Sequence, residues 1–259
     1  MCPPLQTFLS FLTRLYIVAV VDTTIMPRSR INLHTHTLYS DGDFTVMEVV
    51  RSAFEAGLTH IAITDHFETC KIINPLKRMD FERYMRDIKA ARMMYEGRIN
   101  VLAGVEIDTN PERCDLYELP FYLLNSLDLI LFEYVEDPLQ GGVPLNELRS
   151  FTKDLKVPFG LCHWDMDRIY RERDPAWLAD RLSEIGAFVE VPTSQHYARQ
   201  GRFLYEHSDR FYDAFREKVK VSIGTDMHHS LAEVGNIGRG LDFLRSKGLC
   251  GQLLFNGQK

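Results

Sequence analysis

Residues 31–36 of this 259-residue chain read Ile-Asn-Leu-His-Thr-His, a short apolar run that ends in two histidines. Residues i and i+2 of a strand point to the same face of a sheet, so His34 and His36 are expected to lie side by side. Two imidazoles held together in this way suit a shared metal ion better than ordinary packing. The segment therefore predicts a strand whose carboxyl end carries metal ligands.

Four other apolar runs end in residues of the same ligand type. They are residues 61–66 (Ile-Ala-Ile-Thr-Asp-His), 101–106 (ending in Glu), 159–163 (Phe-Gly-Leu-Cys-His) and 221–228 (ending in Asp-Met-His). A single pair of histidines could arise by chance, whereas five such strand ends indicate a site that holds more than one metal ion.

The order of apolar runs and helical patterns predicts an α/β fold. Strands are expected at residues 30–34, 59–64, 100–106, 127–132, 158–162, 187–191 and 220–224. Helices are expected at 43–57 (capped by Asp43), 80–96, 145–155, 174–185 (opened by Asp174-Pro175), 202–218 and 230–247, whereas 107–126 has the weakest pattern. The alternation favours a closed or nearly closed parallel barrel, in which the chemistry gathers at the carboxyl ends of the strands.

Composition narrows the class of protein. The chain is long enough for one barrel domain, and its 45% hydrophobic and 25% charged residues are ordinary for a globular protein. A net charge of −6 disfavours a general nucleic-acid surface, although bound divalent ions could still attract a small anionic substrate. The five cysteines form no CxxC pair, which favours a reducing cytoplasm over a disulfide framework. Strand alternation is expected to aim Cys162 away from the ligand next to it, as a small core residue.

The barrel domain is expected to occupy residues 29–259, after an N-terminal extension at residues 1–28. The apolar stretch 8–21 is interrupted by Arg14, is short for a membrane span, and lacks the basic leading region and cleavage site of a signal peptide. A disordered or over-predicted extension is therefore favoured over a membrane anchor, and Met26 stands where a compact domain could begin.

The motifs together resemble those of a known family. They are His34-x-His36 with Ser40-Asp41-Gly42, Thr64-Asp65-His66, Gly104-Val105-Glu106-Ile107, His163 and Asp226-x-His228. In order and spacing they are similar to the motifs of the PHP (polymerase and histidinol phosphatase) family, over about residues 29–240. The resemblance implies a distorted seven-stranded β/α barrel, two or three divalent ions (zinc, manganese or iron) and hydrolysis of phosphoester bonds.

The resemblance also implies which residues bind each ion. One ion would be held by His34, His36, Glu106 and Asp226, a second by Glu106 and His163, and a third by Asp41, His66 and His228. Carboxylates such as Glu106 can bridge two cations and partly neutralise them, whereas a neutral imidazole fixes direction through one nitrogen.

One departure from the family pattern concerns the second ion. Family members usually carry another histidine between Glu106 and His163, but no histidine occurs at residues 67–162. Glu133, at the end of the predicted strand 127–132, is expected to supply an oxygen instead, which would favour manganese or iron. The alternative is that Glu133 is a surface or supporting carboxylate and that the second site is weak or empty.

Three residues are candidates for the acid that protonates the leaving alkoxide: Asp65, His228 and His196. His196 lies in the loop after the sixth strand, which is expected to overhang the ions. Asp65 has an alternative role, because it could orient His66 or another ligand through a hydrogen bond.

The substrate phosphate is expected to bind a cationic side chain on a strand-end loop. Arg199 and His196 follow the sixth strand, and Arg168 and Lys71 are rivals on other loops. A guanidinium could hold the phosphate through two parallel charge-assisted hydrogen bonds.

The sequence thus predicts a metal-dependent hydrolase of a small phosphomonoester or nucleotide, which uses metal-activated water and has no membrane partner. Two alternatives stay open. An amidohydrolase-type enzyme also begins with HxH, but that family implies eight strands and a bridging lysine on the fourth. A catalytically degraded metal-binding module is suggested by the missing histidine. The specific phosphoester and the oligomeric state are not predicted.

Overall fold

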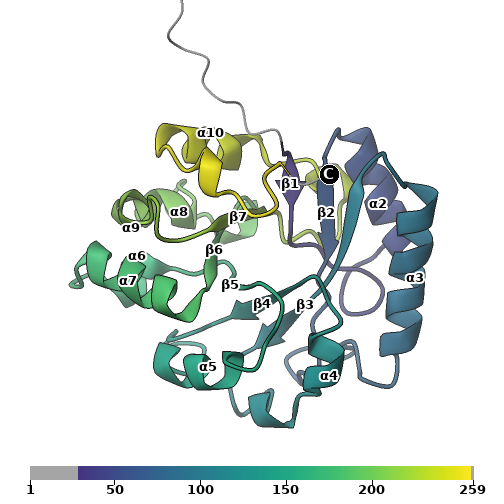
Figure 1. Ribbon diagram of the computed structural model, residues 1–259, viewed down its shortest axis with the longest axis horizontal. Helices are drawn as coiled ribbons and strands as arrows, with labels where there is room; N and C mark the ends of the chain where they lie inside the picture. The colour runs from purple at the N-terminus through teal and green to yellow at the C-terminus, as the bar shows by residue number, and fades with distance from the viewer. Residues whose placement is uncertain (1–28, 258–259) are drawn as a thin grey trace, which may run out of the picture.

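The computed structural model describes residues 29–257 and contains one seven-stranded parallel sheet. The strands follow chain order, each bonded to the next, and the helices surround them (Figure 1). They are β1 (Ile31–Asn32), β2 (His60–Ile63), β3 (Asn100–Asp108), β4 (Leu129–Glu133), β5 (Phe159–Leu161), β6 (Phe188–Pro192) and β7 (Val221–Gly224). Each lies within or overlaps a predicted strand, so the predicted strand positions are confirmed.

The barrel closes between the segment that follows β1 and the segment that follows β7. Thr35 and Met227 form a parallel bridge there. The closing backbone bonds run from Leu33 N–H to the Ile223 carbonyl (2.8 Å), from Asp226 N–H to the His34 carbonyl (2.9 Å), and from His36 N–H to the Met227 carbonyl (2.9 Å). The predicted distorted seven-stranded barrel is confirmed, and its closure brings the first and last ligand motifs into direct contact.

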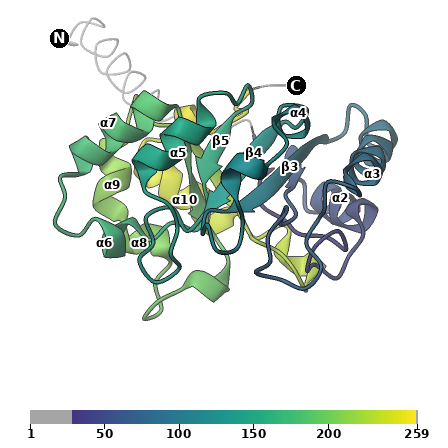
Figure 2. The same cartoon turned by 90° about the horizontal axis from the view of Figure 1, so that it is seen from below.

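Helices link successive strands on the outside of the barrel, with α2 and α3 on one side and α7 and α9 on the opposite side (Figure 2). They are α2 (Val46–Glu55), α3 (Phe81–Met94), α4 (Phe121–Leu124), α5 (Leu145–Thr152), α6 (Met166–Ile169), α7 (Pro175–Ile185), α8 (Leu204–His207), α9 (Asp209–Ala214) and α10 (Gly238–Ser246). Short 3₁₀ turns lie at Leu116–Glu118, Gln195–Tyr197, Leu231–Glu233 and Cys250–Gln252.

Some predicted helix boundaries were wrong. Thr45, not Asp43, caps α2, because the Thr45 hydroxyl accepts the Glu48 N–H while the Glu48 carboxylate accepts the Thr45 N–H. The predicted helix 202–218 is divided into α8 and α9 at buried Ser208, whose hydroxyl accepts the Asp167 N–H. The predicted start of α7 is confirmed: Asp174 caps it, and Pro175 is its first residue.

Residues 1–28 lie outside the described part of the chain, and so does the apolar stretch 8–21 that was weighed as a membrane anchor. None of the helices between residues 29 and 257 has the length and apolar content that crossing a bilayer requires.

Gly160 of β5 shows how closely the barrel wall packs. A Cβ atom at this position would lie 2.2 Å from the ring of Phe188 in β6. Phe188 is itself buried, so its ring has little room to move. We expect Gly160→Ala to lower the free energy of unfolding by about 1–3 kcal/mol, measured by urea denaturation.

Gly238 is a matched control, because it is the exposed first residue of α10 and an added Cβ would meet no heavy atom within 4 Å. Alanine is also the better helix former, so Gly238→Ala should unfold at the wild-type urea concentration or above it. Wild-type stability of the Gly160→Ala protein would contradict the packing described for β5 and β6.

Candidate active site

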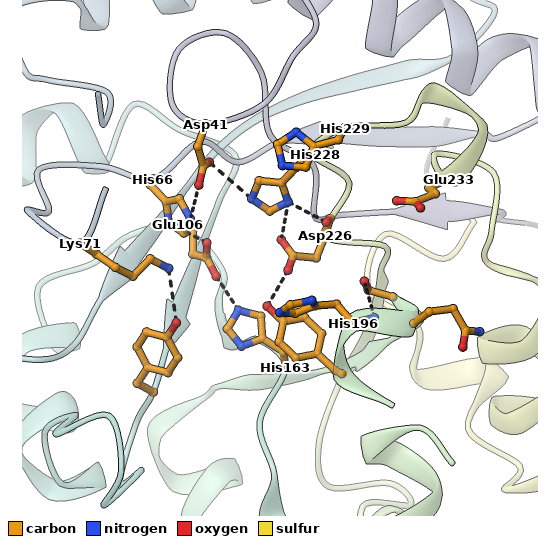
Figure 3. Close-up of a pocket in the computed structure, with 14 residues that line it drawn as sticks. Asp41, His66, Lys71, Glu106, His163, His196, Asp226, His228, His229 and Glu233 are labelled. Atoms are coloured by element: carbon orange, nitrogen blue, oxygen red, sulfur yellow. Dashed lines mark hydrogen bonds and ion pairs between the residues drawn. The ribbon is translucent and has the colours of Figure 1, made fainter. Parts of the chain in front are cut away.

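A pocket of about 700 Å³ opens at the carboxyl ends of the strands (Figure 3). Asp41, His66, Glu106, His163 and Asp226 point into it from the segments that end or follow β1, β2, β3, β5 and β7. His34 and His36 lie buried beneath its floor, and His228 lines its wall. Residues from widely separated parts of the sequence therefore meet in one place.

Glu106 lies at the centre and is fully buried. Its Oε1 is 2.8 Å from His163 Nε2 and 3.4 Å from His34 Nε2, and its Oε2 is 2.9 Å from His66 Nδ1 and 3.5 Å from His36 Nε2. Burial would raise the pKa of Glu106, but the charges of His66 and His34 and the hydrogen bond from His163 hold it well below its usual value. Both carboxylate oxygens are thus available as anionic ligands.

A first group of ligand atoms comes from His34, His36 and Asp226. The two Nε2 atoms are 3.1 Å apart, and Asp226 Oδ1 is 3.2 Å from that of His34 and 3.0 Å from that of His36. Ligands that share one ion at ~2.0–2.2 Å come to within roughly 3 Å of each other, so this group fits a metal ion. Burial, together with the charges of His228 and His66, lowers the pKa of His36 to about 3, which keeps its imidazole neutral.

A second group consists of His36, Asp41, His66 and His228. Asp41 Oδ1 is 3.6 Å from His36 Nδ1 and 3.4 Å from His228 Nε2, and its Oδ2 is 3.7 Å from His66 Nε2. Burial would lower the pKa of His228, but the neighbouring carboxylates of Asp41 and Asp226 raise it to about 9. The Asp41 and His228 side chains of this group are partly exposed, whereas all three side chains of the first group are buried.

Three buried atoms of this site lack a hydrogen bond of good geometry: Asp41 Oδ1, and His66 Nδ1 and Glu106 Oε2, which form an ion pair at 2.9 Å. Buried polar atoms are almost always paired, so unpaired ones call for a ligand. All three belong to the groups that could hold a metal ion. The residues present therefore fit divalent cations, as the sequence predicted from the strand ends.

Glu133, at the end of β4, lies beside the same centre. Its Oε1 is 3.7 Å from His66 Nδ1, and its Oε2 is 3.9 Å from His163 Nε2. Both oxygens also accept hydrogen bonds of 2.8 Å from Lys71 Nζ. Burial and the charge of Glu106 raise the pKa of Glu133, and the ammonium of Lys71 opposes them.

The expectation that Cys162 points away from the ligands was wrong. Its thiol donates to Glu106 Oε1 at 3.1 Å, and it forms a further candidate metal group with His34, Glu106 and His163. Strand β5 ends at Leu161, and His163 has a left-handed backbone with φ of 33°, so strand alternation no longer applies. Burial, followed by the charge of Glu106, raises the pKa of the Cys162 thiol.

Asp65 is fully buried and supports the chain beside it. It accepts hydrogen bonds from the Thr37 N–H at 2.8 Å, the Thr37 hydroxyl at 2.7 Å and the Ser40 hydroxyl at 2.6 Å. These bonds hold the turn that leads to Asp41. Asp65 does not line the pocket, so its role is to support this turn.

The cationic loop residues take different positions. His196 is exposed and lines the pocket. Lys71 also lines the pocket but is only partly exposed. The Arg199 guanidinium lies 3.0 Å from Asp165 and 3.4 Å from Asp167. Arg168 pairs with Asp137 and Asp165. Both arginines are thus held by carboxylates outside the pocket lining, whereas Lys71, a rival candidate, faces it.

Two residues of the site were missed by sequence reasoning. Glu190 Oε1 is 2.9 Å from His34 Nδ1, and its Oε2 accepts the His163 N–H at 2.7 Å. Tyr197 donates its hydroxyl to Asp226 Oδ2 at 2.6 Å, and its ring stacks on His163 at 4.6 Å. A carboxylate in the middle of the apolar strand Phe188–Pro192 was an available signal for Glu190.

Glu190 orients a candidate ligand, so we expect Glu190→Gln to weaken metal affinity by about 10–100-fold. An amide can still accept one hydrogen bond but lacks the charge that favours the Nδ1–H tautomer of His34. Titration against a chelating dye would measure the change. Glu55→Gln, on the exposed side of α2, is the control and should bind like wild type. Equal affinities for all three proteins would contradict this role.

Comparisons with known proteins agree with this geometry. The family model described as "PHP domain" matches residues 32–225, more than half of the chain. A protein named "Probable phosphatase" from Thermoanaerobacter sp. (strain X514) is 26% identical over 241 residues, covering 87% of this chain and 89% of that protein. The DNA polymerase/3'-5' exonuclease PolX of Bacillus subtilis is 32% identical over 81 residues, 31% of this chain and only 14% of that protein.

A solved structure has the same fold. Histidinol phosphate phosphatase from Lactococcus lactis subsp. lactis Il1403, complexed with zinc, L-histidinol and phosphate, superimposes with a TM-score of 0.55 at 15% identity. The match covers 85% of this chain and 94% of that one. With the family model matched across most of the barrel, this chain belongs to the PHP domain family.

Proposed function

We propose that this protein is a metal-dependent phosphatase that hydrolyses a small phosphomonoester or a nucleotide. The observation that carries the proposal is the convergence of the two ligand groups on the buried carboxylate of Glu106, on the floor of an open pocket. The relatives named as phosphatases, and the zinc and phosphate bound in the Lactococcus lactis structure, support the same reaction class.

In this proposal His34, His36, Glu106 and Asp226 hold one divalent ion. Asp41, His66 and His228 hold another, which His36 also borders. When bound, such ions would lower the pKa of water and neutralise charge on a transferring phosphoryl group. Zinc, manganese and iron all accept this mixture of imidazole and carboxylate ligands.

The protein's own residues would orient the substrate and move the proton. Tyr197 lines the pocket, and its hydroxyl donates a hydrogen bond to Asp226. Among the three residues predicted as the acid, His196 both lines the pocket and lies outside the metal-binding groups. We therefore assign to His196 the protonation of the leaving alkoxide.

The alternatives are less well supported. An amidohydrolase-type enzyme would have eight strands and a bridging lysine on the fourth, whereas the described residues form seven strands and Lys71 follows β2. A degraded metal-binding module was suggested by the missing histidine. The intact ligand groups around Asp226 and Asp41 support an active enzyme instead.

We also propose that residues 29–259 form one catalytic domain and that the protein works in a reducing compartment. The thiols of Cys70, Cys114, Cys162 and Cys250 are free, which suits the cytoplasm better than an oxidising space.

The test is a screen of phosphorylated metabolites and nucleotides, with histidinol phosphate included. Purified protein is assayed for release of inorganic phosphate with added Mn²⁺ or Zn²⁺ and again after chelation. We expect metal-dependent release from at least one compound, and none from His34→Ala protein that is folded by circular dichroism. Wild-type protein that binds its ions but releases no phosphate from any compound would instead be a metal-binding module.

A further inference from the structure

The corner of the site beneath Glu133 already contains a positive charge from the protein. Lys71 Nζ lies 2.8 Å from both carboxylate oxygens of Glu133, which is fully buried. This ammonium uses a lone pair on each oxygen and places a positive charge beside both of them, where a metal ion would otherwise lie. Glu133 is therefore engaged by a fixed cation.

Other contacts keep the Lys71 ammonium in this place. Its side chain is only 20% exposed, and Nζ lies 3.4 Å from the Tyr134 hydroxyl and 5.2 Å from the Tyr134 ring centroid. Figure 3 shows the Lys71 side chain, which comes from the loop after β2, pointing into the pocket. An ammonium with an ion pair, a hydroxyl and an aromatic face around it is a built feature of the site, unlike a solvated surface lysine.

The same corner is one of the places where a divalent ion could bind. His66, Glu106 and Glu133 form a candidate metal group, and His163 Nε2 lies 3.9 Å from Glu133. A divalent ion there would compete with Lys71 for the Glu133 oxygens and would be repelled by its charge. The groups around Asp226 and Asp41 include neither Lys71 nor Glu133. The group that contains Cys162 and His163 shares His34 with the Asp226 group, so it is not counted as a separate ion.

We propose that the ammonium of Lys71 takes the place of a metal ion at Glu133, so that this centre binds two divalent ions and not three. The inference rests on the metal-dependent function proposed above and specifies its metal complement. Lys71 acts as a positioning residue that neutralises Glu133. The two ions occupy the Asp226 and Asp41 groups, with Glu106 beside both.

The test is the number of ions that the full-length protein binds, measured by elemental analysis after loading with Mn²⁺ and desalting. We expect two ions per chain for wild type and three for Lys71→Met, in which a neutral side chain of similar length frees Glu133. Lys71→Arg keeps the charge and should bind two. Lys77→Met, a loop lysine outside the pocket that holds the ligand groups, is the matched control and should also bind two.

Three ions in wild type, or two in folded Lys71→Met, would overturn the proposal. If Lys71→Met does not fold, anomalous diffraction from Mn²⁺-loaded wild-type crystals decides the question. Two peaks away from Glu133, with Lys71 still on its carboxylate, support the assignment, and a peak bonded to Glu133 refutes it. Since ions are counted without substrate, a failure of the phosphatase screen remains distinguishable from a failure here.

Discussion

Glu106→Gln is expected to reduce metal-dependent phosphate release by at least about 10³-fold. Among the described residues, Glu106 is the only one whose carboxylate lies within 3.5 Å of all four of these imidazoles: His34, His36, His66 and His163. The substitution removes a charge that lies beside both ion groups. A loss of about 4 kcal/mol of transition-state stabilisation corresponds to this factor. The measurement is kcat/KM on the best compound from the screen.

A matched substitution separates this effect from general damage. Glu118→Gln changes the same side chain at an exposed position of the 3₁₀ turn Leu116–Glu118 and should retain wild-type turnover. Circular dichroism should show that both variants are folded, because the amide has nearly the shape of the carboxylate. Wild-type turnover and metal content in Glu106→Gln would remove Glu106 from the centre of the reaction.

Removal of the metal ions is expected to lower the melting temperature by about 8–16 °C. Four carboxylates lie close together, those of Asp41, Glu106, Glu133 and Asp226. Among residues 29–257, Lys71 is the one lysine that lines their pocket. Ions present at about 1,000 times their Kd would stabilise the folded state by ~4 kcal/mol. For a domain of this size each kcal/mol corresponds to roughly 2–4 °C.

Thermal unfolding with and without EDTA measures the difference, and added Mn²⁺ should restore the original value. The Glu106→Gln protein serves as a control, since its weaker binding should make its melting temperature less sensitive to EDTA. An unchanged melting temperature of wild type after verified removal of the ions would show that the carboxylate cluster does not need them for stability.

The predicted barrel and the position of its ligands at the strand ends came from local patterns, whereas the ligands assigned to each ion came from the resemblance to the PHP family. Apolar runs such as residues 61–66 and 221–228 signal buried strands, and the polar residues that end them fall at the carboxyl edge of a parallel barrel. Because that architecture collects every strand end at one mouth, local pattern was enough to anticipate that His34, Glu106 and Asp226 would meet.

Other features were out of reach because they depend on how the chain turns after a strand ends. The left-handed backbone of His163 breaks strand alternation, so that both Cys162 and His163 reach Glu106. Arg199, one of the candidates for the phosphate, pairs with Asp165, whose approach depends on the packing of another loop. No local periodicity encodes such pairings.

The sequence by itself determined the seven-stranded barrel and the ligand types at its strand ends, because periodicity and barrel topology together specify which residues share a face and an edge. Only the tertiary structure decided how these groups are charged and supported. The carboxylate of Glu190 behind His34 and the ammonium of Lys71 on Glu133 come from distant segments. Their contacts exist only once the chain has closed, since a side-chain pair across a barrel leaves no regular spacing in the sequence.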